Sequence, residues 1–102
     1  MQQLVEREMG RGGALVNSHG CVLDQNIVTP RMRQYRDCSS PDSDRTSAIA
    51  LWLVLEEFPG ECGGYQVVYS EESGQFGLAI VDDTGDLFLG FYGSLLDAFH
   101  AM

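Results

Sequence analysis

The side chains with the most versatile chemistry in this chain are three cysteines and two histidines. His19 and Cys21 are close enough in sequence to form one pair of zinc ligands, with Cys38 and Cys62 as distant partners. Structural zinc is normally held by two close pairs of ligands, and only one close pair exists here. We therefore favour a turn histidine beside a small buried thiol, and we expect neither metal nor cofactor.

Cys62 is a second candidate, as the nucleophile of a thiol enzyme with His100 as its base. A thiolate needs nearby cations, and three acidic neighbours would instead raise the pKa of the Cys62 thiol: Glu56, Glu57 and Glu61. We therefore expect a protein that is not an enzyme.

An acidic turn, Asp82-Asp-Thr-Gly-Asp86, follows an apolar run. Its tripeptide Asp83-Thr84-Gly85 resembles the active-site motif of the aspartic proteases, which would imply a catalytic aspartate. The resemblance covers about ten residues, departs from the family at Asp86, and leaves too few residues for the rest of that fold. Three carboxylates could also attract Ca²⁺, although the spacing differs from an EF-hand loop. A hairpin turn explains the segment fully, since Asp and Gly are preferred turn residues.

Charge divides the chain into two unequal halves. The 102 residues contain 15 acidic and 6 basic residues, for a net charge of −9, and every basic residue is arginine. Residues 1–45 balance to zero, whereas residues 46–102 have nine acids and no basic residue. The only basic cluster, Arg31, Arg33 and Arg36, is small and is expected to lie on a solvated helix face, where it would neutralise local acids within the chain or make a small contact to an acidic partner. Direct binding of nucleic acid or anionic membranes is disfavoured, because phosphates require cations.

The first half predicts short elements. Residues 1–9 form a weak helical pattern, residues 14–16 and 21–23 a hairpin, and residues 30–35 a short helix capped by Thr29. The clearest helix is predicted between Ser43 or Asp44 and Phe58, where Pro59-Gly60 would end it. This segment has no polar residue from 48 to 55, so we expect a helix that is buried on all sides.

The second half changes to a period of two residues. Three strands are predicted at residues 65–70, 75–81 and 87–92, with Gly-containing turns between them, followed by a short helix capped by Ser94. The predicted fold class is α+β in one domain, residues 1–102. It is an antiparallel β-meander of three strands, which the N-terminal hairpin could extend to five, packed against the long apolar helix and the short C-terminal helix.

In an antiparallel meander, the start of the first strand, the end of the second and the start of the third lie at the same end of the sheet. The predicted meander would therefore gather carboxylates at that end. We name as the acidic pole the six residues expected at that end: Glu56, Glu57, Glu61, Asp82, Asp83 and Asp86. Glu71 and Glu72 would lie at the opposite end. Clustered like charges destabilise a fold, so the pole is expected either to bind a basic partner or to keep the protein dispersed.

The leading hypothesis is a small acidic binding protein. It would inhibit a nucleic-acid-handling partner by docking carboxylates, Glu71 and Glu72 included, on a basic surface, either as a nucleic-acid mimic or by masking that surface. In size, charge and lack of lysine it resembles phage-encoded inhibitors of host defence, such as the anti-CRISPR proteins. The resemblance is one of profile and rests on no motif.

The alternative is a structural or homo-oligomerisation module. Its interface would comprise the apolar helix and Tyr65, Tyr69 and Tyr92, with the acids serving solubility only. The N-terminus has acidic residues where a signal peptide would be apolar, and the longest apolar run is eight residues, so we expect a cytoplasmic protein.

Overall fold

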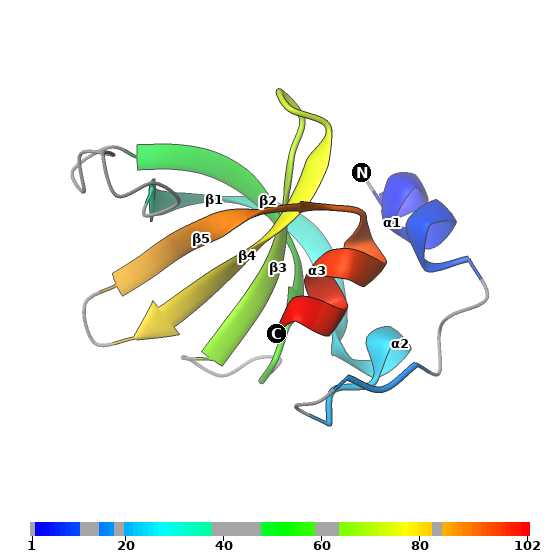
Figure 1. The fold of residues 1–102 in the computed structure, drawn as a ribbon. Coiled ribbons are helices and arrows are strands. Elements are labelled where there is room, and N and C mark those ends of the chain that lie inside the picture. Colours follow the sequence, from blue (N-terminus) through cyan, green and yellow to red (C-terminus); the bar gives the residue numbers. More distant parts are fainter. Residues whose placement is uncertain (1, 11–14, 18–19, 38–47, 59–63, 83–84) are drawn as a thin grey trace.

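Five strands close into a barrel in the computed structural model (Figure 1). The structure describes residues 2–10, 15–17, 20–37, 48–58, 64–82 and 85–102. Apart from the pair β1 and β5 that closes the barrel, neighbouring strands are consecutive in sequence. Their bounds are β1 Ile27–Asp37, β2 Ala48–Glu56, β3 Gly64–Ser70, β4 Gln75–Asp82 and β5 Gly85–Gly93.

The barrel closes between its first and last strands. All consecutive pairs are antiparallel, so with an odd number of strands β1 and β5 must run in the same direction. Their parallel pairing joins Arg36 to Leu87 and Asp37 to Phe88. The backbone bonds of this seam are thus made by the end of β1 and the start of β5.

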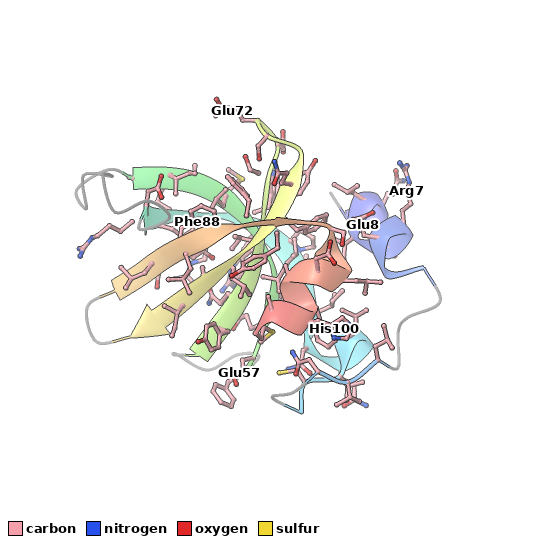
Figure 2. All side chains as sticks on the ribbon, in the orientation of Figure 1. Arg7, Glu8, Glu57, Glu72, Phe88 and His100 are labelled. Carbon is pink, nitrogen blue, oxygen red and sulfur yellow. The ribbon has the colours of Figure 1, made fainter. Side chains whose placement is uncertain are left out.

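Three helices accompany the barrel in the described part of the chain: α1 Gln2–Met9, α2 Leu23–Asn26 and α3 Leu95–Ala101. Ser94 caps α3 as predicted, because its Oγ accepts a hydrogen bond from the Asp97 backbone N–H at 3.1 Å. Glu8 lies on the side of α1 toward α3 and accepts from the Leu95 N–H at 3.3 Å (Figure 2). The two terminal helices are therefore joined at the start of α3.

The larger of two hydrophobic cores lies between the outer surface of the barrel and these helices. It contains residues from α1, the 21–23 segment, β2, β3, β4 and α3: Val5, Cys21, Leu23, Val54, Leu55, Val67, Phe76, Leu78, Leu95, Ala98, Phe99 and Met102. Asn17 fastens the N-terminal segment to this core. Its Nδ2 donates to the Phe99 carbonyl at 2.9 Å, and its Oδ1 accepts from the Cys21 N–H at 3.1 Å.

The smaller core fills the barrel interior. It consists of one buried residue from each strand, with Ile49 packed against them: Tyr35, Leu51, Val68, Ala79 and Phe88. Gly77 belongs to the same face of β4, and a Cβ there would clash with the Gly90 carbonyl oxygen. The small side chains of β4 therefore line the narrow interior, while its large ones, Phe76 and Leu78, pack against the helices.

The predicted fold class is wrong in its central element. The segment expected to be a long apolar helix is strand β2, and no long apolar helix occurs among the described residues. Ile49, Leu51 and Leu53 alternate with Trp52 and Val54, so β2 has one face in the barrel and one toward the outer core. A strand buried on both faces has the same continuous apolar run as a buried helix, and periodicity alone cannot separate them.

The three antiparallel strands expected in the second half are present as β3, β4 and β5, but within a closed barrel instead of an open meander. The short helix expected at residues 30–35 is also wrong, because these residues belong to β1. Pro30 lies where the β1–β2 register shifts between Ile27 and Arg31, a place that tolerates a residue without an N–H.

The predicted N-terminal hairpin is reduced to a single antiparallel bridge between Val16 and Val22, and it adds no strand to the sheet. Ala14 lies outside the described residues. In the described part of the chain, every helix falls short of the length and apolar character needed to cross a bilayer.

Candidate functional site

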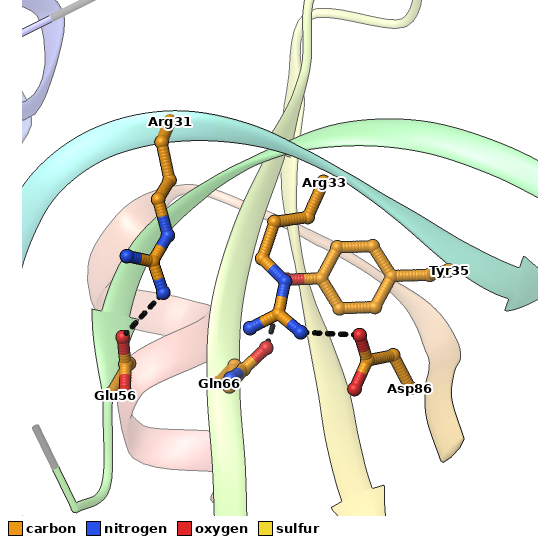
Figure 3. A network of polar contacts seen from close by, with 6 residues as sticks. All are labelled: Arg31, Arg33, Tyr35, Glu56, Gln66 and Asp86. Atoms are coloured by element: carbon orange, nitrogen blue, oxygen red, sulfur yellow. Dashed lines mark hydrogen bonds and ion pairs between the residues drawn. The ribbon is translucent and has the colours of Figure 1, made fainter. Parts of the chain in front are cut away.

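The basic cluster of the sequence lies on β1, and its alternate residues enter one end of the barrel. Arg31, Arg33 and Tyr35 share the inward face of the strand, since Tyr35 belongs to the interior core and side chains alternate along a strand. Tyr35 is 1% exposed, whereas the guanidinium side chains lie progressively nearer to solvent. Each of the three reaches a polar group on another strand (Figure 3).

Two ion pairs and one hydrogen bond make up this network. Arg33 Nη2 lies 2.5 Å from Asp86 Oδ2 on β5, and Arg31 Nη2 lies 3.5 Å from Glu56 Oε1 on β2. The Tyr35 hydroxyl donates to Gln66 Oε1 on β3 at 2.8 Å, between two buried residues. The Arg33–Asp86 pair connects β1 to β5, the two strands that meet at the seam.

An irregularity in β2 places Glu56 in this network. Leu53 pairs with Val68 and Leu55 pairs with Val67, so the register shifts by one residue between them. Val54 and Leu55 consequently both belong to the outer core, and Glu56 pairs with Gln66 on the inward face. Without the extra residue, Glu56 would point away from Arg31.

Burial raises the pKa of Tyr35 well above its ordinary value of 10.0. Arg33 acts in the opposite direction, and the carboxylates of Asp86 and Glu56 add to the upward shift. The phenol is thus a neutral hydrogen-bond donor, and its role in this network is to join β1 to β3.

The register brings the backbone of Glu56, Asp82 and Asp86 to one end of the barrel, with Glu57 beside them. Glu57 Oε1 accepts from the Tyr65 N–H at 3.1 Å. Glu61 and Asp83 lie outside the described residues, as does the side chain of Asp82. We call this end the paired end, because Glu56 and Asp86 there are neutralised by arginines. The acidic pole was predicted as a cluster of unpaired carboxylates, and Glu56 and Asp86 are instead both paired.

Glu71 and Glu72 lie in the turn between β3 and β4, at the opposite end of the barrel from Glu57 (Figure 2). Both are exposed. Glu71 Oε1 accepts a hydrogen bond from Trp52 Nε1, and Glu72 stands at the tip. Within the described residues, no arginine pairs with either carboxylate. We call this region the hairpin end.

A row of large side chains on the outer face of the barrel leads to the hairpin end. Met32, Trp52, Tyr69 and Phe76 are successive cross-strand partners on β1, β2, β3 and β4. The row begins with Phe76 buried under the helices, continues through Trp52 and Tyr69 at intermediate exposure, and ends with Met32, which is 51% exposed. Sequence reasoning missed this row, although the single tryptophan in a strand-length run was the available signal.

The thiol and histidine candidates gain no catalytic geometry. Cys21 is buried in the outer core, and burial, assisted by the charge of Glu57, raises the pKa of its thiol. His100 is exposed on α3 and stacks edge-on with Phe99. His19, Cys38 and Cys62 lie outside the described residues. The described residues contain no group of three or more His, Cys, Asp or Glu placed to hold a metal ion.

Comparison of the chain with protein-family models, curated proteins and solved structures finds no match. Function must therefore be argued from the two ends of the barrel.

Proposed function

We propose that this protein is a non-enzymatic binding protein that docks carboxylates on a basic surface of its partner. The observation that carries the proposal is the unbalanced half of the chain, residues 46–102, with nine acids and no basic residue. In the described structure, arginines from β1 pair with two of those nine, Glu56 and Asp86. Two more of the nine, Glu71 and Glu72, are exposed and have no arginine partner among the described residues.

The proposed partner is a nucleic-acid-handling protein, and the proposed effect is inhibition. Exposed carboxylates can occupy the cationic surface with which such a protein binds phosphates. This is the profile of phage-type anti-defence proteins, the anti-CRISPR proteins among them. We propose the cytoplasm as the compartment, because the thiol of Cys21 is free and reduced thiols suit that environment.

The role proposed for Asp82, Asp83 and Asp86 changes with the geometry. Asp86 is held by Arg33 and so offers little charge to a partner. Asp82 and Asp83 remain candidates through sequence alone. Glu71 and Glu72 become the best-supported docking residues, since they are exposed and lack an arginine partner among the described residues.

The test is capture of partners from the native host at about 50 mM salt and elution at about 0.5 M, with double-stranded DNA as competitor. We expect salt to release the partner and DNA to compete for it. The Glu71→Gln/Glu72→Gln protein should lose capture, while Glu6→Gln/Asp97→Asn, with the same net charge and exposed positions, should retain it. Capture that resists salt and survives neutralisation of Glu71 and Glu72 would overturn the proposal.

A homo-oligomerisation module is the second candidate, but not through the predicted helix, which is strand β2. It is favoured by Leu89, Phe91 and Tyr92, three large apolar side chains exposed on β5. Tyr65 and Tyr69, the other proposed interface residues, have intermediate exposure. Sedimentation distinguishes the candidates, because a dimer that persists in high salt and dissociates in Tyr92→Ser supports self-association.

A further inference from the structure

The indole of Trp52 and the carboxylate of Glu71 form a composite surface that the proposed acidic docking does not by itself explain. The two residues are 19 positions apart, and they meet because β2 and β3 pair at Trp52 and Tyr69. Their hydrogen bond lies at the exposed surface. A negative charge is thereby held at the edge of an aromatic ring.

The fixed position of the carboxylate matters for binding. An exposed glutamate normally loses side-chain freedom when it forms an ion pair, and this loss offsets much of the attraction. The Trp52 N–H already restrains Glu71, so less freedom remains to be lost. A carboxylate can accept about four hydrogen bonds, and the indole uses one of them.

The neighbouring side chains supply apolar contact and further negative charge. Tyr69 and Met32 flank Trp52 as its cross-strand partners, and Ala50 beside it is exposed and small. Glu72 follows Glu71 in the turn. The surface thus offers a half-buried indole, an aliphatic border and two carboxylates.

We propose that this surface, Met32, Trp52, Tyr69, Glu71 and Glu72, seats an arginine side chain of the basic partner. The guanidinium would stack on Trp52 while donating to Glu71. Arginine fits better than lysine, because its planar group can stack and form paired hydrogen bonds at the same time. The inference rests on the proposed function and assigns its point of contact.

The occupant follows from charge complementarity. A second copy of this chain would bring another net charge of −9 to a surface that carries two carboxylates. An arginine-bearing segment removes that repulsion and covers the part of the Trp52 side chain that remains accessible. A second copy is therefore an outcome of the test and not the proposal.

The chain provides its own reporter, since Trp52 is the only tryptophan. Hexa-arginine and hexa-lysine peptides are titrated at low salt, with binding followed both by Trp52 emission and by the anisotropy of a labelled peptide. We expect hexa-arginine to change the emission and to bind more tightly than hexa-lysine. Glu71→Gln should weaken hexa-arginine binding by about threefold, and the control Glu6→Gln by much less.

Trp52→Phe keeps an aromatic ring but removes the N–H and weakens the cation–π contact, so we expect about threefold to fivefold weaker hexa-arginine binding by anisotropy. Circular dichroism confirms that each variant is folded, and Glu71→Gln tests the same surface without altering the apolar row.

The outcomes separate the two proposals. If neither peptide binds the unaltered protein, the proposed function fails and the arginine seat fails with it. If hexa-arginine binds but Trp52 emission is unchanged and Glu71→Gln behaves like Glu6→Gln, the seat is wrong and the function stands. A salt-resistant dimer that buries Trp52 would assign the surface to a second copy and overturn the seat.

Discussion

The two ends of the barrel carry acidic residues in different states. At the paired end, Glu56 and Asp86 form ion pairs with Arg31 and Arg33. The buried hydrogen bond between Tyr35 and Gln66 belongs to the same network (Figure 3). At the hairpin end, Glu71 and Glu72 face solvent beside a half-buried indole. Carboxylates of the first kind join strands through ion pairs, and those of the second kind are exposed with no arginine partner among the described residues.

The difference shows that formal charge along a sequence and charge available for binding are separate quantities. The arginines of the first half of the chain fold back onto acids of the second half, so part of the apparent asymmetry cancels in space. The cancellation is local. It occurs at the end where the acids had been expected to be most concentrated and leaves the turn between β3 and β4 untouched.

The largest expected effect is a loss of stability on changing Tyr35, whose side chain fills the barrel interior next to the paired end. Tyr35→Ala removes a fully buried aromatic side chain from the barrel interior and should lower the free energy of unfolding by about 3–5 kcal/mol. Tyr35→Phe keeps the ring and leaves Gln66 Oε1 without its donor, at a cost of about 1–2 kcal/mol. Urea unfolding followed by circular dichroism measures both. Equal losses in the two variants would contradict a packed interior beneath the polar layer.

A smaller effect separates a paired carboxylate from an exposed one. Asp86→Asn should destabilise the protein by about 1 kcal/mol, because Arg33 loses its charged partner in a partly buried position. Glu72→Gln should change stability by less than about 0.5 kcal/mol.

A double-mutant cycle with Arg33→Met isolates the coupling of Arg33 to Asp86. The same cycle between Arg33 and Glu72 is its control and should show no coupling. Coupling of equal size in both cycles would mean that the two ends do not differ.

The smallest effect is expected from alkaline pH. The folded-state pKa of Tyr35 is raised, so the folded protein holds this proton more tightly than the unfolded chain does. The stabilisation is fully present below the unfolded pKa near 10 and decreases as pH rises above it, by less than about 1 kcal/mol up to pH 10.5. Urea unfolding at pH 8.5 and 10.5 should show a steeper loss for the unaltered protein than for Tyr35→Phe. Equal losses of unfolding free energy in the two proteins would mean that the phenol is in contact with solvent.

The sequence predicted the second half of the fold better than the first. The turns between β3, β4 and β5 and the cap at Ser94 are local signals, which need only Gly, Asp and Ser at the right places. The segment at residues 48–56 lacks such a signal, because a strand with two buried faces shows no alternation. Barrel closure depends on the pairing of Arg36 with Leu87, residues far apart in the chain, and no local pattern indicates it.

The site was predictable to a similar extent. The predicted meander placed Asp86 at one end of the sheet, and the predicted helix ending at Phe58 was expected to bring Glu56 to the same end. The register places both residues there, although Glu56 arrives on strand β2 and not on a helix. Their pairing with Arg31 and Arg33 could not be foreseen while residues 30–35 were assigned to a helix. The row through Trp52 was hidden for the same reason, since a helix would not align Trp52 with Tyr69.

The most direct test compares two double variants that both carry a net charge of −7. Glu71→Gln/Glu72→Gln alters the hairpin end, and Glu56→Gln/Asp86→Asn alters the paired end. Each is titrated with labelled hexa-arginine under conditions where circular dichroism shows a folded protein. We predict about tenfold weaker binding for the hairpin-end variant and a change within about twofold for the paired-end variant. Equal weakening of the two, or greater weakening at the paired end, would contradict the account.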